Sequence, residues 1–298
     1  MIISENNWIN DNLTKSGLIS DYDIKFNLYP FKPLKFHDAA QKTAIKISEK
    51  YKNLYVGLSG GIDSEYVLVC FHKLKIPIIP LIILCEGNEE ETKYAFKICK
   101  KLNIIPKVIT CSNIEILDIC ISFIYKKMNG VGFESATKIF AAQYVKNNNG
   151  TLVCGEHIIG DGNVLIKHSE YTMNEWDGYD SLYYGDQIGF FTYTPELTYS
   201  MISGNTLDGE NMSWKEYKSK LFELEMRQKI FYTYPERIEK IFESMYRVDP
   251  IEKKQFDTLR SLGIPWRPPK RFSTNNNFKK EIRWKKNEIL DIFKPYLI

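Results

Sequence analysis

The sequence predicts an α/β protein in which a parallel sheet is sandwiched by helices, followed by a mainly helical C-terminal region. Short apolar runs alternate along the chain with segments whose apolar residues recur at helical spacing, and this alternation is typical of parallel sheets. The runs are apolar almost throughout, as strands buried on both faces are. A pair of glycines, Gly60 and Gly61, lies directly between the first run and the helix after it.

The alternating elements lie between residues 36 and 155. The first helix has its apolar face at Ala39, Ala40, Ala44 and Ile47, and the turn-forming run 147–150 separates the last helix from the last strand. In chain order we expect a helix over 36–50, a strand over 54–58, a helix over 65–74, a strand over 77–85, a helix over 89–102, a strand over 107–111, helices over 114–127 and 134–146, and a strand over 151–155.

The flanking regions are less regular. Residues 1–35 are polar and aromatic, and Pro30 and Pro33 interrupt any regular element, so we expect an irregular arm. Residues 160–212 are rich in Gly, Tyr, Asp and Asn, with weak periodicity. Later helices are expected over 195–202, 214–231, 235–246 and 278–293. We therefore divide the chain into an N-terminal arm (1–35), an α/β domain (36–165) and a C-terminal region (166–298).

The composition is that of a soluble globular protein, with 44% hydrophobic and 26% charged residues. No apolar run reaches the roughly 18 residues that a membrane span needs, so no membrane association is expected. The first residues show no basic segment followed by an apolar one, so no signal peptide is expected. The six cysteines mostly lie in apolar segments and none follows Cys154. These features favour a reducing cytoplasm.

The segment 59–64, Ser-Gly-Gly-Ile-Asp-Ser, suits a phosphate cradle. Adjacent glycines let the backbone approach an anion and adopt positive φ, and the N–H groups and dipole of a helix start favour negative charge. Ser59 and Ser64 add hydroxyl donors. Asp63 has the wrong charge for a bare phosphate and is better explained as a Mg²⁺ ligand. A plain glycine-rich turn is the alternative, but the flanking strand and helix favour phosphate binding.

The pattern Ser-Gly-Gly-x-Asp-Ser resembles the loop of the PP-loop ATP pyrophosphatases, or adenine nucleotide alpha hydrolases, over residues 36–165. It is not a Walker A loop, since no Gly-Lys-Ser/Thr follows the glycines. The resemblance implies a HUP-type, Rossmann-like fold that uses ATP with Mg²⁺, forms AMP and pyrophosphate, and employs Ser59 and Asp63 in catalysis. It also implies nucleotide contacts at the loop and the strand ends, namely Gly57, Leu58, Ser59, Gly60, Gly61, Ile62, Asp63, Ser64, Leu84 and Gly155.

A second metal ligand is expected after the strand over 151–155. The family ends a later strand in a glycine followed by polar or acidic residues, and Gly155 with the residues up to Asp161 fits that position. Glu156 or Asp161 would then complete a magnesium site with Asp63. A surface turn built from the same residues is an equally good interpretation.

The absence of certain residues and domains narrows the class of reactions that we expect. The chain has no Cys-x-x-Cys pair and no cysteine after Cys154, so sulfur transfer is not expected, and Cys154 itself is expected to be a core residue. We favour an asparagine synthetase-like ligase that activates an acceptor carboxylate or carbonyl for attack by a nitrogen nucleophile. No glutamine-hydrolysing domain precedes the loop, so the nitrogen would come from free ammonia, an amine substrate or a separate ammonia-supplying partner.

Two features of the sequence leave alternatives open. Segment 183–197 is aromatic and glycine-rich, and either lines an acceptor pocket or only leads into a helix. Residues 250–298 carry 12 Lys and Arg against 5 Asp and Glu, a net charge of +7. A solvated face is the simpler explanation and a small-molecule acceptor is favoured, whereas a nucleic acid partner would indicate a tRNA- or nucleobase-modifying enzyme. A non-catalytic nucleotide-binding module is a third class, which the complete loop argues against.

Overall fold

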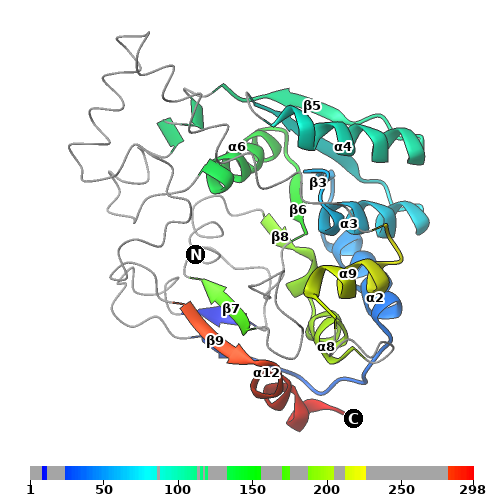
Figure 1. The fold of residues 1–298 in the computed structure, drawn as a ribbon, viewed down its shortest axis with the longest axis vertical. Coiled ribbons are helices and arrows are strands. Elements are labelled where there is room, and N and C mark those ends of the chain that lie inside the picture. Colours follow the sequence, from blue (N-terminus) through cyan, green and yellow to red (C-terminus); the bar gives the residue numbers. More distant parts are fainter. Residues whose placement is uncertain are drawn as a thin grey trace, which may run out of the picture.

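The computed structural model describes the α/β region and parts of the flanking regions (Figure 1). The described residues are 9–11, 24–85, 88–112, 115–116, 118–119, 133–155, 170–174, 187–204, 212–225 and 281–298.

A five-stranded parallel sheet forms the centre of the fold, with the strand order β5-β4-β3-β6-β8. Its strands are β3 (Leu54–Gly57), β4 (Ile79–Leu84), β5 (Lys107–Thr110), β6 (Thr151–Cys154) and β8 (Gln187–Gly189). Tyr55 pairs with Ile79 on one side of β3 and with Leu152 on the other. The predicted α/β fold with a parallel sheet is therefore confirmed.

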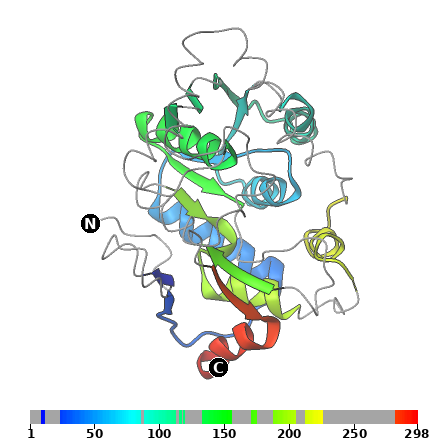
Figure 2. The ribbon, with the colours of Figure 1, turned by 60° about the vertical axis from the view of Figure 1, so that its left-hand side comes forward.

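Helices flank this sheet (Figures 1 and 2). They are α2 (Phe36–Lys50), α3 (Ile62–Lys73), α4 (Glu89–Leu102) and α6 (Phe133–Asn147). The core between these layers contains fully buried Val56, Val67, Phe71, Ile82 and Val153. Branched and aromatic side chains at these positions explain why the apolar runs fold as interior strands.

Most predicted elements of this region are confirmed within a few residues. The helices over 36–50 and 89–102 have the predicted limits. Helix α3 begins at Ile62 and not at Glu65, so that Asp63 and Ser64 belong to its first turn. Of the helix expected over 114–127, only residues 115–116 and 118–119 are described, and all four are helical. The fifth strand, β8, was not predicted, because three residues are too few to show a period.

The prediction of an irregular N-terminal arm was wrong in part, because two short strands form within it. Strands β1 (Ile9–Asp11) and β2 (Ile24–Phe26) pair in antiparallel register. Further along, the Phe31 N–H donates to the Tyr296 carbonyl at 2.8 Å, and the Ile298 N–H donates to the Phe31 carbonyl at 3.2 Å. Phe31 is buried against the ring of Phe293. The arm is thus tied by backbone hydrogen bonds to the last residues of the chain.

The C-terminal region also departs from prediction. The helix expected over 278–293 is instead a strand, β9 (Glu281–Lys285), followed by helix α12 (Lys286–Phe293) and the 3₁₀ turn η5 (Lys294–Tyr296). Strand β9 pairs antiparallel with β7 (Glu170–Asn174). Pairing with a distant strand overrides local helical periodicity here. The Lys285 N–H donates to the Glu288 carboxylate at 2.6 Å, which caps the start of α12.

Two helices and a 3₁₀ turn follow β8 in the chain and pack against other helices of the fold. They are η3 (Phe190–Thr192), α8 (Pro195–Ser203) and α9 (Trp214–Phe222). Helix α9 was predicted to continue to residue 231 but ends at Phe222, where Glu223 adopts left-handed φ of 54°. The helix predicted over 235–246, and most of the basic segment 250–298, lie outside the described residues.

Among the described residues, no helix combines the length and the hydropathy of a membrane span. The five described cysteines, Cys70, Cys85, Cys99, Cys111 and Cys154, are buried free thiols. Burial raises the pKa of Cys70 and Cys111 to about 12, which keeps both thiols protonated at neutral pH.

Candidate nucleotide-binding site

The loop between β3 and α3 lies at the point where the strand order of the sheet reverses. The chain runs from β3 to β4 on one side and later returns to β6 on the other side of β3. Open α/β sheets bind ligands outside the carboxyl ends of their strands at such a point.

Gly60 gives this loop its close approach to α4. Its φ is +86°, and a Cβ built on it would lie 2.5 Å from the Glu91 carbonyl oxygen and 3.1 Å from the Ala95 nitrogen. Only glycine satisfies both the conformation and the contact. The loop backbone therefore packs directly on the first turns of α4.

Two serine hydroxyls meet at the start of α3. Ser59 Oγ lies 3.2 Å from Ser64 Oγ, and the Gly61 N–H donates to Ser59 Oγ at 3.3 Å. Ser64 Oγ donates to the Gly61 carbonyl at 3.0 Å. The start of α3 lies beside them, and the N-terminus of a helix carries a partial positive charge and N–H groups that have no carbonyl partner within the helix. This cluster of donors can bind an oxyanion.

Gly155, at the end of β6, closes the site from the other side. A Cβ on Gly155 would lie 2.8 Å from the Asp63 carbonyl carbon and 2.9 Å from the Ser64 nitrogen. The end of β6 thus packs against the first turn of α3 with no room for a side chain. Gly155, predicted from the family resemblance as a nucleotide contact, therefore lies next to the loop.

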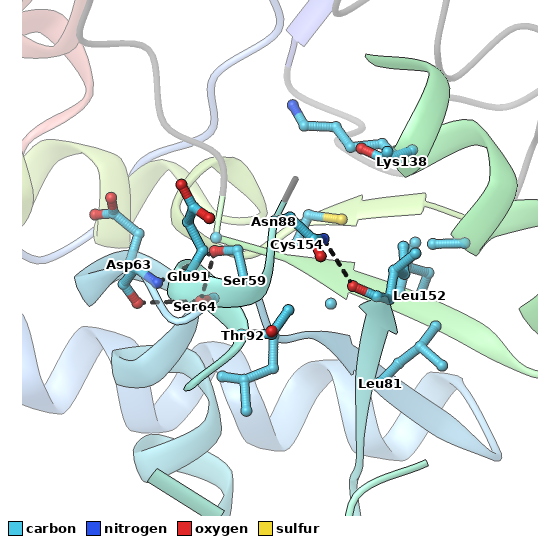
Figure 3. A pocket seen from close by; sticks show the side chains of 17 residues that line it. Ser59, Asp63, Ser64, Leu81, Asn88, Glu91, Thr92, Lys138, Leu152 and Cys154 are labelled. Atoms are coloured by element: carbon cyan, nitrogen blue, oxygen red, sulfur yellow. Dashed lines mark hydrogen bonds between the residues drawn. The ribbon is translucent and has the colours of Figure 1, made fainter. Parts of the chain in front are cut away.

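A pocket of about 410 Å³ opens beside the loop (Figure 3). This volume lies within the range of small-molecule sites. Leu81, Ile83 and Leu152 give it an apolar wall. The remaining lining residues are Gly57, Leu58, Ser59, Gly61, Asp63, Ser64, Asn88, Glu91, Thr92, Thr137, Lys138, Ala141, Cys154 and Gly155.

The start of α4 contributes polar side chains to this pocket. Asn88 braces the end of β4, since its Nδ2 donates to the Ile83 carbonyl at 2.9 Å and its Oδ1 accepts from the Cys85 N–H at 3.1 Å. One turn later, Glu91 and Thr92 are both buried. The pocket is thus apolar along the sheet and polar along the two helix N-termini.

Asp63 forms an ion pair with a lysine that lies 155 positions later in the chain. Lys218 Nζ donates to Asp63 Oδ1 at 2.8 Å and to Oδ2 at 2.6 Å. The Lys218 side chain is 9% exposed and that of Asp63 is 25% exposed. Both carboxylate oxygens therefore face a cation in a largely desolvated place.

A stack of aromatic rings brings α9 to this position. Phe222 stacks on Tyr66 with ring centroids 4.5 Å apart and on Phe191 at 5.3 Å. Tyr66 follows Asp63 by three residues on α3, and Phe222 follows Lys218 by four residues on α9. Each aromatic residue shares a helix face with its charged neighbour, so the stack sets the two charges opposite each other.

The rim of the stack is polar. Tyr66 Oη lies 2.9 Å from His37 Nδ1, and His37 Nε2 lies 3.5 Å from the Glu223 carboxylate. Burial raises the pKa of Tyr66 well above its usual range, so this hydroxyl is neutral and acts as a hydrogen-bonding group.

Most of the predicted nucleotide contacts meet in one place. Gly57, Leu58, Ser59, Gly61, Asp63, Ser64 and Gly155 line the pocket, whereas Gly60 packs on α4 and Ile62 opens α3. Leu84 is not among the lining residues. Leu81 and Ile83 lie there instead, because alternate residues of a strand point to opposite faces. Glu156 and Asp161 lie outside the described residues.

The donor set present can hold a hard cation if phosphate oxygens complete it. Asp63 and Glu91 supply carboxylates, and Ser59 and Ser64 supply hydroxyls. Among the described residues no group of three His, Cys, Asp or Glu side chains is placed to hold a metal ion. Mg²⁺ fits such a site, since it is usually bound by one or two carboxylates together with water and substrate phosphates.

Sequence reasoning missed the contributions of α4, α6 and α9. The residues concerned are Asn88, Glu91, Thr92, Thr137, Lys138 and Lys218. Lys218 did carry a signal, because it lies on the same helix face as the apolar Trp214, Leu221 and Phe222. A lysine within the buried face of a helix needs an anionic partner.

Cys154 lines the pocket but is not expected to take part in chemistry. It is buried and lies at the end of β6. Replacing Cys154 by alanine should leave ATP turnover within about twofold of wild type and cost about 1 kcal/mol of stability, as loss of a small buried group does. Turnover assays and thermal melting measure both effects. A folded C154A protein without activity would instead support sulfur chemistry.

Comparison with known proteins gives only distant structural similarity. No protein-family model matches the chain, and no curated protein matches it either. An NH3-dependent NAD synthetase from Campylobacter jejuni aligns over 77% of this chain and 96% of its own length, with 19% identity and a TM-score of 0.34.

Two other solved structures give similar values. An NMN synthetase from Francisella tularensis aligns over 72% of this chain and 95% of its own, with 18% identity and a TM-score of 0.33. A predicted tRNA methyltransferase subunit from Methanocaldococcus jannaschii aligns over 76% and 95%, with 17% identity and a TM-score of 0.37. At these values the similarity assigns neither a family nor an activity to this chain.

Proposed function

We propose that this chain binds ATP in the pocket beside residues 59–64 and transfers its AMP moiety to an acceptor, releasing pyrophosphate. The observation that carries this proposal is the loop itself. The Ser59 and Ser64 hydroxyls converge at the N-terminus of α3, directly on the wall of a pocket of about 410 Å³. Donors in this arrangement bind phosphate oxygens.

Different residues of the pocket would bind different parts of ATP. The apolar wall of Leu81, Ile83 and Leu152 would hold the adenine and ribose, and the loop would hold the phosphates. The loop N–H groups and hydroxyls would stabilise the charge that develops on the leaving pyrophosphate. Mg²⁺, held by Asp63 with Glu91 nearby, would neutralise phosphate charge when bound. Asp161 remains a candidate third ligand.

We further propose that the acceptor is a small molecule. Its carboxylate or carbonyl oxygen would attack the α-phosphate, and a nitrogen nucleophile would then displace AMP, as in an asparagine synthetase-like ligase. The five described cysteines are buried free thiols, and this supports nitrogen and not sulfur as the incoming atom. The nitrogen source would be ammonia, an amine or an ammonia-supplying partner chain.

The products of ATP test this proposal directly. Protein incubated with α-labelled ATP, Mg²⁺ and a small-molecule extract of cells should form AMP and pyrophosphate in equal amounts. A parallel reaction with purified RNA should form neither above background. AMP formed only with RNA would make RNA the acceptor, and ADP with orthophosphate as the primary products would exclude the proposed reaction.

A further inference from the structure

The carboxylate proposed to hold Mg²⁺ already holds a cation. Lys218 Nζ contacts both oxygens of Asp63, at 2.8 and 2.6 Å. A metal ion that used either oxygen would meet the ammonium group at close range. Two cations cannot share one carboxylate in a partly desolvated place without strong repulsion.

The position of Lys218 is set by packing and not by chance contact of a surface chain. Helix α9 is held to α3 by the stack of Tyr66 and Phe222, and the Lys218 side chain is 9% exposed. The backbone of Lys218 is therefore fixed, while its four-carbon side chain can still change rotamer. The ammonium can leave Asp63 only if another anion receives it, since an unpaired buried charge is costly.

We propose that Lys218 competes with Mg²⁺ for Asp63, so that the metal binds well only together with the phosphates of the nucleotide. This inference rests on the proposed role of Asp63 as a metal ligand. A triphosphate supplies the negative charge that both the metal ion and the displaced ammonium require. Lys218 is then a positioning residue that suppresses metal binding in the absence of nucleotide.

A titration with Mn²⁺ measures this competition without any turnover. EPR detects the free ion, so the loss of its signal reports binding to the protein. In nucleotide-free protein, K218M and K218Q should bind Mn²⁺ at least about tenfold more tightly than wild type, because the competing ammonium is gone. K218R keeps the charge and should stay within about twofold of wild type. K220M is the matched control, since Lys220 lies on the exposed side of the same helix.

The nucleotide provides the second comparison. With α,β-methylene-ATP bound, and with the Mn²⁺ held by the nucleotide alone subtracted in a protein-free control, the affinity of wild type for Mn²⁺ should rise to nearly that of K218Q under the same conditions, because the phosphates release Lys218 from Asp63. Circular dichroism and thermal melting establish that each variant is folded. K218Q, which keeps a polar side chain, serves if K218M does not fold.

Equal Mn²⁺ affinity in wild type, K218M and K218Q would overturn the proposal. So would an unchanged high affinity in D63N/K218M, because the metal would then be bound elsewhere. Neither result would affect the proposed AMP transfer, which is measured separately from pyrophosphate release. Conversely, wild-type protein could show the competition between Lys218 and the metal ion but form no AMP. That result would contradict the proposed function and leave this inference standing.

Discussion

Replacing Asp63 by asparagine should lower the rate of AMP formation about a hundred- to a thousandfold. The change removes the carboxylate proposed to hold Mg²⁺ against the phosphates, and loss of one such charge-stabilising contact commonly costs about 3–4 kcal/mol of transition-state stabilisation. Asparagine has nearly the same size, so packing around the first turn of α3 is kept. Pyrophosphate release at saturating ATP measures the effect.

The same substitution should also lower stability, by about 1–3 kcal/mol. Lys218 would keep its charge in a place where it is 9% exposed, with only a neutral amide opposite. The double variant D63N/K218M removes both charges and should recover much of this loss in a denaturant titration, without recovering turnover. An active D63N protein would exclude Asp63 from the reaction.

Adding a single methyl group at Gly60 or Gly155 should have the largest effect on stability. In G60A the new Cβ would meet the Glu91 carbonyl at 2.5 Å, and φ of +86° is unfavourable for alanine. In G155A it would meet backbone atoms of Asp63 and Ser64 below 3.0 Å. Backbone cannot yield as a flexible side chain does, so we expect losses of about 1–3 kcal/mol in G155A and more in G60A.

Gly57 provides the matched control for these two positions. A Cβ there would meet only Leu152 Cδ1, at an ordinary van der Waals distance of 3.7 Å. The free energy of unfolding of G57A should therefore lie within about 0.5 kcal/mol of the wild-type value. Urea titrations of the three variants test the expected order of stability, in which G57A is the most stable and G60A the least. Equal stability of G57A and G155A would contradict the close packing of β6 on α3. The two clashing variants should also bind ATP more weakly, because the start of α3 must shift.

The α/β region was predictable because its signals are local. The alternation of apolar runs and helical segments over 36–155 needs no knowledge of distant contacts. The loop is local as well, since Ser59 and Ser64 lie five positions apart and meet through a single turn. Gly155 lies far from the loop in the sequence, and it was predicted as a nucleotide contact only from the resemblance to the PP-loop family.

The remaining features depend on contacts between distant parts of the chain. The sequence of β9 was interpreted as part of a helix, because the pairing with β7 that makes it a strand cannot be seen locally. Helix α9 ends early because Glu223 takes a left-handed conformation, which side-chain periodicity does not reveal. The ion pair of Asp63 and Lys218 joins residues 155 positions apart. The apolar helix face around Lys218 predicts an anionic partner for this lysine, but nothing in the sequence alone identifies Asp63 as that partner.

The bridge between Phe31 and Leu297 has a consequence for synthesis on the ribosome. Strands β3, β4, β5 and β6 end by Cys154, so these four can associate while the second half of the chain is still being made. The segment around Phe31 completes its packing only later, because its ring contacts Tyr199 and Phe293 and its backbone pairs with Leu297. A chain whose synthesis stops before Phe293 would leave part of this ring exposed, as an apolar surface to which chaperones can bind.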